Sequence, residues 1–277
     1  KEDVFYYICN GISRNNVAVY NFTLPRTPTD IAGCTMWYDF SDADTLFTDA
    51  GLTKVSTNDD AIYQANDKSG EDNHLAQSTE EYRPLYKTGI KNGLSISRYD
   101  GLNDYLGETM QLVNTGNGEW TIFVIAKRTK ISSNVQYVLS QDNEALWADR
   151  VAQYIRLGSS EDSYKLGSIA FDTSDGITYQ IYYSQNFTDY VAIASVCSTS
   201  QIEIYANGTA SGSPTSITGT LNKSTELLSL GGGRINATEG KEYFGGDICE
   251  VIGYNTALSD TDRQSVETYL NNKWSIY

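Results

Sequence analysis

The stretch Asp67-Lys-Ser-Gly-Glu-Asp-Asn-His74 is followed in this sequence by Arg83-Pro84 and then by Arg98-Tyr-Asp-Gly-Leu-Asn-Asp-Tyr-Leu106. Asp and Asn next to Gly are residues that tight turns favour, because their short side chains bond to nearby backbone groups. The run Ser95-Ile-Ser-Arg-Tyr99 is typical of a strand, and Asp100-Gly101 is typical of the turn after it. These segments predict short strands joined by tight turns.

The same pattern extends outward from these motifs. The stretch Trp120-Thr-Ile-Phe-Val-Ile-Ala-Lys127 is a continuous apolar run, as a fully buried central strand would give. Further short β-prone runs, with turn residues between them, lie at 136–140, 153–157, 165–171, 178–183, 190–196, 201–205, 227–231 and 246–254. Many short strands at near-regular spacing predict a β-sandwich or jelly roll.

One helix is predicted near the C-terminus. The stretch Ser259-Asp-Thr-Asp262 has the form of a capping box, in which a serine side chain bonds the backbone three residues later. The apolar residues that follow recur at helical spacing and form one face: Val266, Tyr269, Leu270 and Trp274. We therefore expect this helix to pack on the sandwich, with Trp274, and Trp37 of an early strand, in the core.

Together these segments resemble a known family. The spacing DKSGxxNH…RP…RxDGxNDYL, the opening segment 36–44 and the C-terminal stretch 250–270 are similar to laminin-G-like domains of the concanavalin A-like lectin/glucanase superfamily, of the kind found in phage virion proteins and bacterial adhesins. The resemblance covers about residues 33–277. It implies an all-β, antiparallel jelly-roll sandwich with a short C-terminal helix, and a domain that binds carbohydrate or protein surfaces.

The first 30 residues differ from the rest of the chain. Two short strands are predicted there, at 4–8 and 17–22, and a stiff connector follows in Leu24-Pro-Arg-Thr-Pro28, because proline breaks strand pairing. We predict an N-terminal extension or anchor at 1–30 and the sandwich at 31–277.

The chain is strongly acidic, with 35 Asp and Glu against 20 Lys and Arg and a formal net charge of −15. Nucleic acid binding requires clustered basic residues to neutralise phosphates, and the basic residues here are scattered. The sequence also lacks the run of about 18 apolar residues that would span a membrane. We expect neither nucleic acid binding nor membrane insertion. The acidity suits a virion, extracellular or cell-surface location, although acidity that only serves solubility gives the same composition.

Catalysis is not expected. Retaining glycosidases need two carboxylates about 5 Å apart. Catalytic relatives within the superfamily that this chain resembles carry E-x-D-x-x-E on one strand, and Gly245 here replaces the first glutamate. Asp247 and Glu250 are three residues apart, which on a regular strand places them on opposite faces. The single histidine, His74, lies in a turn motif.

Calcium is a possible cofactor, because acidic residues gather in three segments. Calcium takes about six to eight oxygen ligands, including carboxylates and loop carbonyls. The same residues are also what turns need for their own backbone bonds, so both interpretations stay open. The candidate ligands are Asp39, Asp42, Asp67, Asp72, Asp100 and Asp104.

Ligand contacts are expected in loops. Trp147, Asp149 and Arg150 place an aromatic ring among polar residues in a predicted connection. Tyr164 and Arg234 lie in two further predicted loops, and each of these residues is equally suited to cover the core.

We therefore expect a non-catalytic carbohydrate- or surface-binding module of a larger extracellular assembly, most of all a capsid-decoration or tail-fibre protein of a phage virion. Its expected partners are a cell-surface glycan and other subunits of that assembly. Two alternatives remain: a purely structural protein held by protein–protein contacts, and a glycoside hydrolase.

Overall fold

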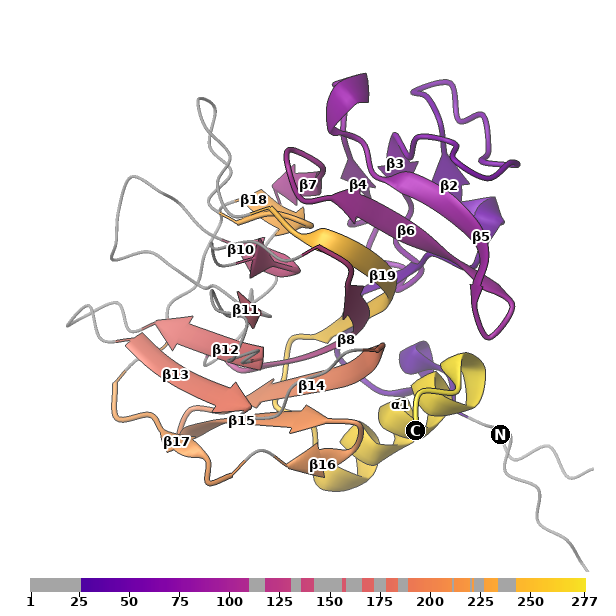
Figure 1. Cartoon of the computed structure of the whole chain (residues 1–277). Coiled ribbons are helices and arrows are strands. Elements are labelled where there is room, and N and C mark those ends of the chain that lie inside the picture. The colour runs from indigo at the N-terminus through magenta and orange to yellow at the C-terminus, as the bar shows by residue number, and fades with distance from the viewer. Residues whose placement is uncertain are drawn as a thin grey trace, which may run out of the picture.

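The computed structural model describes residues 26–109, 118–130, 136–141, 156–157, 166–171, 178–183, 189–210, 212–219, 221, 227–233 and 243–277. Within these residues the chain forms two large antiparallel sheets and one α-helix near the C-terminus (Figure 1). The predicted all-β sandwich with a C-terminal helix is confirmed. The two strands expected at 4–8 and 17–22 lie outside the described residues.

The larger sheet has the strand order β16-β15-β14-β8-β19-β6-β5, with β1 beside β19 and β17 beside β15. Its central strands, β8 and β19, are among the most deeply buried elements, as the continuous apolar run in β8 predicted. The strands are β1 (Cys34–Asp39), β5 (Leu85–Lys91), β6 (Leu94–Asp100), β8 (Trp120–Arg128), β14 (Val191–Cys197), β15 (Gln201–Ala206), β16 (Thr209–Ala210), β17 (Thr215–Ser216) and β19 (Gly245–Tyr254).

The smaller sheet has the order β10-β18-β7-β4-β3-β2. Its strands are β2 (Leu46–Phe47), β3 (Gln64–Ala65), β4 (Leu75–Ala76), β7 (Leu106–Thr109), β10 (Leu139–Gln141) and β18 (Leu227–Leu230). Two separate antiparallel pairs join β9 (Gln136–Tyr137) to β11 (Arg156–Leu157) and β12 (Leu166–Phe171) to β13 (Thr178–Tyr183). Short 3-10 helices occur at η1 (Pro28–Asp30), η2 (Ala43–Thr45) and η3 (Glu80–Tyr82).

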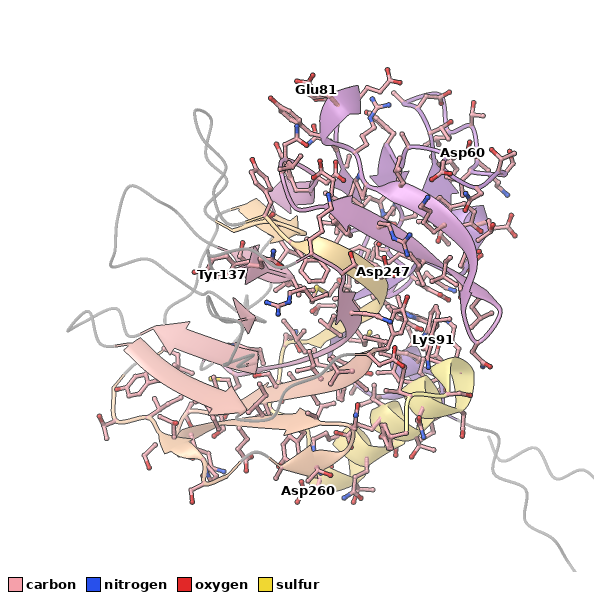
Figure 2. The ribbon with its side chains drawn as sticks, in the orientation of Figure 1. Asp60, Glu81, Lys91, Tyr137, Asp247 and Asp260 are labelled. Carbon is pink, nitrogen blue, oxygen red and sulfur yellow. The ribbon has the colours of Figure 1, made fainter. Side chains whose placement is uncertain are left out.

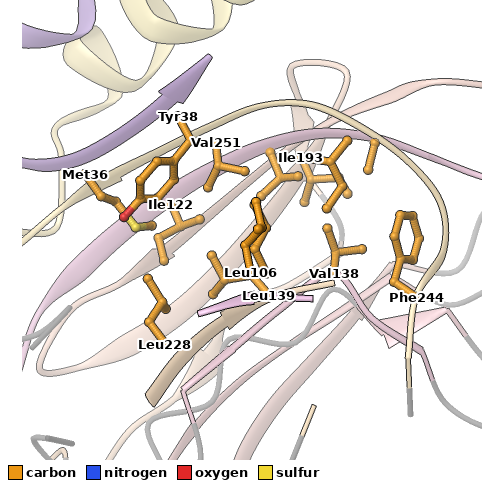
Figure 3. Close-up of a cluster of buried hydrophobic side chains, with 14 of the residues drawn as sticks. Met36, Tyr38, Leu106, Ile122, Val138, Leu139, Ile193, Leu228, Phe244 and Val251 are labelled. Carbon is orange, nitrogen blue, oxygen red and sulfur yellow. The ribbon is translucent and has the colours of Figure 1, made fainter. Parts of the chain in front are cut away.

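The main core lies between the two sheets (Figure 3). Met36, Tyr38 and Val251 come from the larger sheet, and Leu106 and Leu228 come from the smaller one. Each is almost completely buried, and burying one such apolar side chain contributes about 1.5–3 kcal/mol. Leu106, the last residue of the DGLNDYL motif, therefore joins this motif directly to the core.

A second core lies between the outer face of the larger sheet and α1 (Asp260–Trp274). The Ser259 side chain accepts a hydrogen bond from the Asp262 N–H at 3.2 Å, which confirms the predicted N-cap. Trp274 is fully buried and Trp37 is 9% exposed, so their predicted core positions are also confirmed. Tyr269 is only partly buried, and its hydroxyl donates to a carboxylate described below.

Strand β19 contains a β-bulge that corrects one prediction. Asp247 pairs with Lys127 of β8, but Glu250 pairs with Ile125, only two residues away, so Cys249 is the extra residue. Residues two apart on β8 share a face, and therefore Asp247 and Glu250 lie on the same face of the sheet, not on opposite faces. The expectation failed because it assumed a regular strand.

The Asp67–His74 motif forms a turn that is hydrogen-bonded to strand β1. The Asp67 carboxylate accepts hydrogen bonds from the N–H groups of Trp37, Ser69 and Asn73. The His74 Nδ1 atom accepts from the Asp67 N–H at 3.2 Å. These bonds tie β1 to the turn, so the motif has a structural role.

The described chain begins at Arg26 and already contacts the sandwich there. Arg26 forms an ion pair with Asp262 of α1 at 2.8 Å, and the Tyr254 hydroxyl donates to the Pro28 carbonyl at 2.9 Å. Pro28 and Ile31 are buried. The division of the chain into an anchor at 1–30 and a domain at 31–277 stays a prediction.

Candidate functional site

The six aspartates considered as calcium ligands make other bonds in the structure or face solvent. Asp39 and Asp42 both accept from the Lys68 ammonium, at 3.0 and 2.6 Å, so a side-chain cation already lies between them. Asp67 bonds the turn described above, and Asp72 is exposed. In the parts of the chain that the structure describes, no group of three or more His, Cys, Asp or Glu side chains could hold a metal ion.

Asp100 and Asp104, the remaining two, organise the turn after β6. The Asp100 carboxylate accepts from the N–H groups of Leu102, Asn103 and Asp104, and Asp104 accepts from the Asp100 N–H at 2.8 Å. Gly101 has φ +74°, a backbone conformation that favours glycine, and a Cβ there would lie 3.0 Å from the Gly245 Cα. The turn therefore requires the residues Asp100 and Gly101 at these positions. Calcium binding stays a prediction.

The Asp104 carboxyl has a raised pKa. Burial and, next, the Asp100 charge raise its pKa to about 7, against the opposing effects of the Asp100 N–H and Lys130. The Lys130 ammonium donates to the Asp100 carbonyl at 2.6 Å. This turn therefore carries a carboxyl group that changes its charge near neutral pH.

The residues predicted as ligand contacts lie outside the described residues. They are Trp147, Asp149, Arg150, Tyr164 and Arg234. Their role stays a prediction, and a candidate site has to be built from other parts of the molecule.

Three partly exposed tyrosines gather near the Asp100 turn, and we refer to Tyr82, Tyr105 and Tyr243 as the tyrosine face. The Tyr105 N–H donates to the Tyr82 carbonyl at 3.0 Å, which joins the β6–β7 loop to η3. Partial burial and the nearby Tyr105, Tyr82 and Asp100 raise the pKa of the Tyr243 phenol. Tyrosine rings beside a carboxylate suit a polyhydroxyl ligand, because the ring contacts apolar C–H surface and the polar groups accept or donate hydrogen bonds.

A second polar group crosses the outer face of the larger sheet, and we refer to it as the basic row: Arg98, Asp247, Lys127, Tyr190 and Lys91, which lies against the Tyr190 ring. Arg98 of β6 is the register partner of Asp247 in β19, which in turn is the partner of Lys127 in β8. Tyr190 directly precedes β14, the next strand of the sheet. Figure 2 labels Asp247.

Asp247 is the buried centre of the basic row, at 1% exposed. Arg98 donates to both of its oxygens, at 2.6 and 2.9 Å, in a bidentate arrangement, and the Tyr190 hydroxyl donates at 2.7 Å. Burial and, next, the hydrogen bond to Asp247 raise the pKa of the Tyr190 phenol, so it stays neutral. The buried carboxylate is thus fully bonded by its neighbours.

The cations of the basic row remain open to solvent. The exposed fraction is 36% for the Arg98 side chain and 32% for the Lys127 side chain. The ammonium groups of Lys127 and Lys91 lie 5.2 and 5.6 Å from the centre of the Tyr190 ring. Lys91 also donates to the Ser275 carbonyl at the end of α1, and Figure 2 shows it between the β5–β6 hairpin and this helix.

Glu250, further along β19, lies at the centre of an enclosed cluster. It is fully buried, and the indole N–H groups of Trp37 and Trp274 donate to it at 2.7 and 2.6 Å. The Tyr269 hydroxyl and the Lys273 ammonium donate at 2.9 and 2.8 Å. Four donors from β1 and α1 therefore surround one carboxylate, and we refer to these residues as the Glu250 cluster.

Lys273 links this cluster to Asp39, with a distance of 2.6 Å to its carboxylate. Burial and, next, the charge of Asp39 raise the pKa of Glu250, while Lys273 and Trp274 oppose this. Burial alone would also raise the pKa of Asp39, but Lys273, Ser41 and Lys68 hold it below its usual value. One lysine thus serves two buried carboxylates, and this arrangement fastens α1 to the sheet.

Sequence reasoning missed both candidate surfaces as sites. Tyr105 and Arg98 lie in the DGLNDYL motif and the strand before it, which the sequence predicts as scaffold, and Asp100 is predicted as a turn residue or a calcium ligand. A usable signal was present in β6, because alternation puts Arg98 and Asp100 on one face. The contribution of Tyr190, Tyr82 and Tyr243 depends on strand order, which the sequence does not reveal.

The fold and these surfaces can be compared with known proteins. The family model described as the concanavalin A-like lectin/glucanases superfamily matches residues 100–262, which is more than half of the chain. The chain belongs to this superfamily. The resemblance found in its turn motifs is thereby confirmed, and the match includes Asp100, Tyr105, Lys127, Tyr190 and Asp247.

Solved structures with the same fold have low sequence identity to this superfamily member. The binding domain of Paraclostridial Mosquitocidal Protein 1 is 11% identical with a TM-score of 0.57, covering 88% of this chain and 54% of that one. A GH54 α-L-arabinofuranosidase is 14% identical with a TM-score of 0.52, covering 85% and 62%. The receptor binding domain of botulinum neurotoxin type G is 11% identical with a TM-score of 0.50, covering 86% and 51%.

The chain thus spans between about half and two thirds of the length of these three chains. At such identities the similarity concerns the fold alone. No curated protein sequence matches the chain. Among the described residues, no helix combines the length and the apolar character that crossing a lipid bilayer would need.

Proposed function

We propose that this chain is a non-catalytic carbohydrate-binding module and that the tyrosine face is its sugar contact surface. The observation that carries this proposal is the grouping of three partly exposed tyrosines beside the Asp100 carboxylate. Tyrosine offers contact area at low conformational cost, and its hydroxyl bonds a polar ligand at the same time.

The position of these tyrosines supports a binding role. Tyr82 comes from η3, Tyr105 from the loop after β6, and Tyr243 from the segment before β19. Ligand contacts concentrate on loops that a rigid scaffold holds in place. The Asp100 turn, with its internal hydrogen bonds, and the buried Leu106 hold Tyr105 on such a scaffold.

The surroundings of the two β19 carboxylates support a non-catalytic role. A retaining glycosidase uses one free carboxylate as nucleophile and one as acid. Here Asp247 is bonded by Arg98 and Tyr190, and Glu250 is enclosed by four donors. Neither carboxylate is positioned to attack a glycosidic bond, although the bulge places both on one face.

Binding to an array of oligosaccharides tests this proposal. We expect Tyr105→Ala to lose about tenfold or more in affinity for any sugar that the unmodified protein binds, because stacking on one aromatic ring contributes about 1–2 kcal/mol. Tyr277→Ala is the matched control, since Tyr277 is an exposed tyrosine at the C-terminus. Turnover of any bound oligosaccharide, or full affinity in Tyr105→Ala, would contradict the proposal.

The wider role that we propose is an extracellular or cell-surface location within a larger assembly, such as a capsid-decoration or tail-fibre protein of a phage virion. The strongly acidic composition and the predicted proline-containing connector at 24–28 support it. Binding of the module to purified virion subunits, with and without residues 1–30, tests it. Equal binding by both forms would exclude 1–30 as the anchor.

A further inference from the structure

We infer that the basic row binds the negatively charged group of an acidic glycan, a carboxylate or a sulfate, while neighbouring sugar rings of the same chain contact the tyrosine face. This inference rests on the proposed function and specifies its ligand class. The two surfaces are adjacent on one molecule, and their chemistry is complementary to the two parts of such a ligand.

The connection between the surfaces runs along β6. Arg98 and Asp100 are two residues apart on this strand, so both face the outer side of the sheet, about 7 Å from each other along the strand. Asp100 pairs with Gly245, two residues after Tyr243, and Arg98 pairs with Asp247. A ligand lying along β6 and β19 therefore passes from the basic row to the tyrosine face.

The basic row has cationic groups available for a ligand. Arg98 uses Nε and Nη2 for Asp247, and its Nη1 atom makes no hydrogen bond to any side chain or backbone group that the structure describes. Lys127 and Lys91 lie over the same tyrosine ring. A guanidinium that is already held in place by a carboxylate presents its remaining donors in a fixed direction, which suits a planar or tetrahedral anion.

The charges within the row also favour an added anion. Arg98 binds the buried Asp247, and Lys127 lies 3.2 Å from Asp189, whose side chain is 73% exposed. Lys91 lies with Lys127 against the Tyr190 ring. A water-exposed partner such as Asp189 compensates Lys127 weakly, because solvent screens surface pairs. Three cations thus converge around one buried anion, and an added anion would relieve their mutual repulsion.

The overall charge of −15 does not oppose such a ligand at close range. At physiological ionic strength, interactions between exposed charges fall off over about 8 Å, so the nearest side chains dominate. The acidic residues near Arg98 and Lys127 are Asp247, Asp189, Asp59 beyond Lys87, and Asp100 further along β6, whose carbonyl Lys130 contacts. The basic row is therefore a local positive region on an acidic protein.

The test measures affinity for three probes by titration calorimetry: galacturonate oligomers, chondroitin sulfate oligosaccharides and uncharged galactan oligomers. We expect one of the two acidic probes to bind at least about tenfold more tightly than galactan, with an affinity that falls as salt rises. The better of the two identifies whether the anion is a carboxylate or a sulfate.

Variants then assign the effect to the basic row. We expect Lys127→Gln and Lys91→Gln each to weaken binding of the acidic probe by about threefold to fivefold, as for a partly exposed ion pair. Lys54→Gln is the matched control, because Lys54 is also paired to an exposed aspartate, Asp44, at a different surface. Both test variants remove amines that are only partly buried, and thermal unfolding checks that each variant is folded.

The outcomes separate this inference from the proposed function. Equal affinity for charged and uncharged probes, with no effect of Lys127→Gln or Lys91→Gln, overturns the acidic ligand but leaves carbohydrate binding in place. Loss of all probes in Tyr105→Ala, together with selective weakening of the acidic probe in the lysine variants, supports both. Failure of every probe to bind contradicts both proposals.

Discussion

Strand β19 holds two buried carboxylates on one face, and the surroundings of Asp247 and Glu250 differ in one decisive way. Around Glu250, helix α1 closes the site, and two indole N–H groups, a phenol and an ammonium complete it. Asp247 is bonded instead by Arg98 and Tyr190 of the sheet itself, and the Arg98 side chain is 36% exposed. The bulge at Cys249 places both carboxylates on this face.

This difference suggests different roles for the two carboxylates, one in stability and one in binding. A buried charge with all its donors inside the protein fixes how two elements pack, and removing one partner leaves an expensive unpaired group. A buried charge whose partners reach solvent instead fixes the direction of donors that a ligand in solution can contact. We therefore expect the Glu250 cluster to govern stability and the basic row to govern binding.

The largest expected effect is on stability, from Lys273→Met. This change removes the single ammonium that serves both Asp39 and Glu250, and leaves two buried carboxylates close together. We expect the free energy of unfolding to fall by about 3–5 kcal/mol, measured by urea denaturation. Lys54→Met, at an exposed pair, should change it by no more than about 0.5 kcal/mol. A loss below about 1 kcal/mol in Lys273→Met would show that α1 is held by apolar packing alone.

Equivalent changes of the two carboxylates compare the sites directly. We expect Glu250→Gln to cost about 3 kcal/mol, because four donors, the Lys273 ammonium among them, lose their anion. Asp247→Asn should cost about 1 kcal/mol, because Arg98 can turn toward water. Both are measured by chemical denaturation at pH 7. Equal costs would mean that solvent access does not distinguish the two sites.

Asp104 offers a change that stabilises the protein. Its folded pKa, about 7, lies above the ordinary aspartate value near 4, so the folded state holds a proton that the unfolded state has lost. Stability is therefore lost as pH rises from about 4 to 7 and then levels off. We expect Asp104→Asn to raise the free energy of unfolding by about 1–2 kcal/mol at pH 8, and by less at pH 5. A gain that does not depend on pH would contradict the protonated state.

The smallest expected effect on stability is that of Lys127→Gln. Its partner Asp189 is mostly exposed, and such pairs contribute between about 0 and 1 kcal/mol. We expect the melting temperature of this variant to stay within about 2 °C of the unmodified protein. A much larger drop would assign Lys127 to the structural class, together with Lys273.

The sequence was sufficient to predict the fold but not the surfaces. Periodicity and turn chemistry identified β6, β8, β14 and the capped helix, and Asp67, Asp100 and Gly101 were correctly interpreted as turn residues. Strand β5 was not predicted, although it forms the hairpin that carries Lys91. The alternation rule also failed at Cys249, because a bulge depends on pairing across the sheet. The residues of the basic row come from β5, β6, β8, β19 and the start of β14, so only strand order could reveal it.

The most direct test of the central claim is a nuclear magnetic resonance titration with the acidic oligosaccharide that binds best. The backbone and side-chain signals of the protein report which residues sense the ligand. We predict changes centred on Arg98, Lys127, Tyr105 and Tyr243, with those of the Glu250 cluster unaffected. Changes confined to other segments, such as those containing Trp147, Tyr164 or Arg234, would contradict the claim that the outer face around Asp247 is the binding surface.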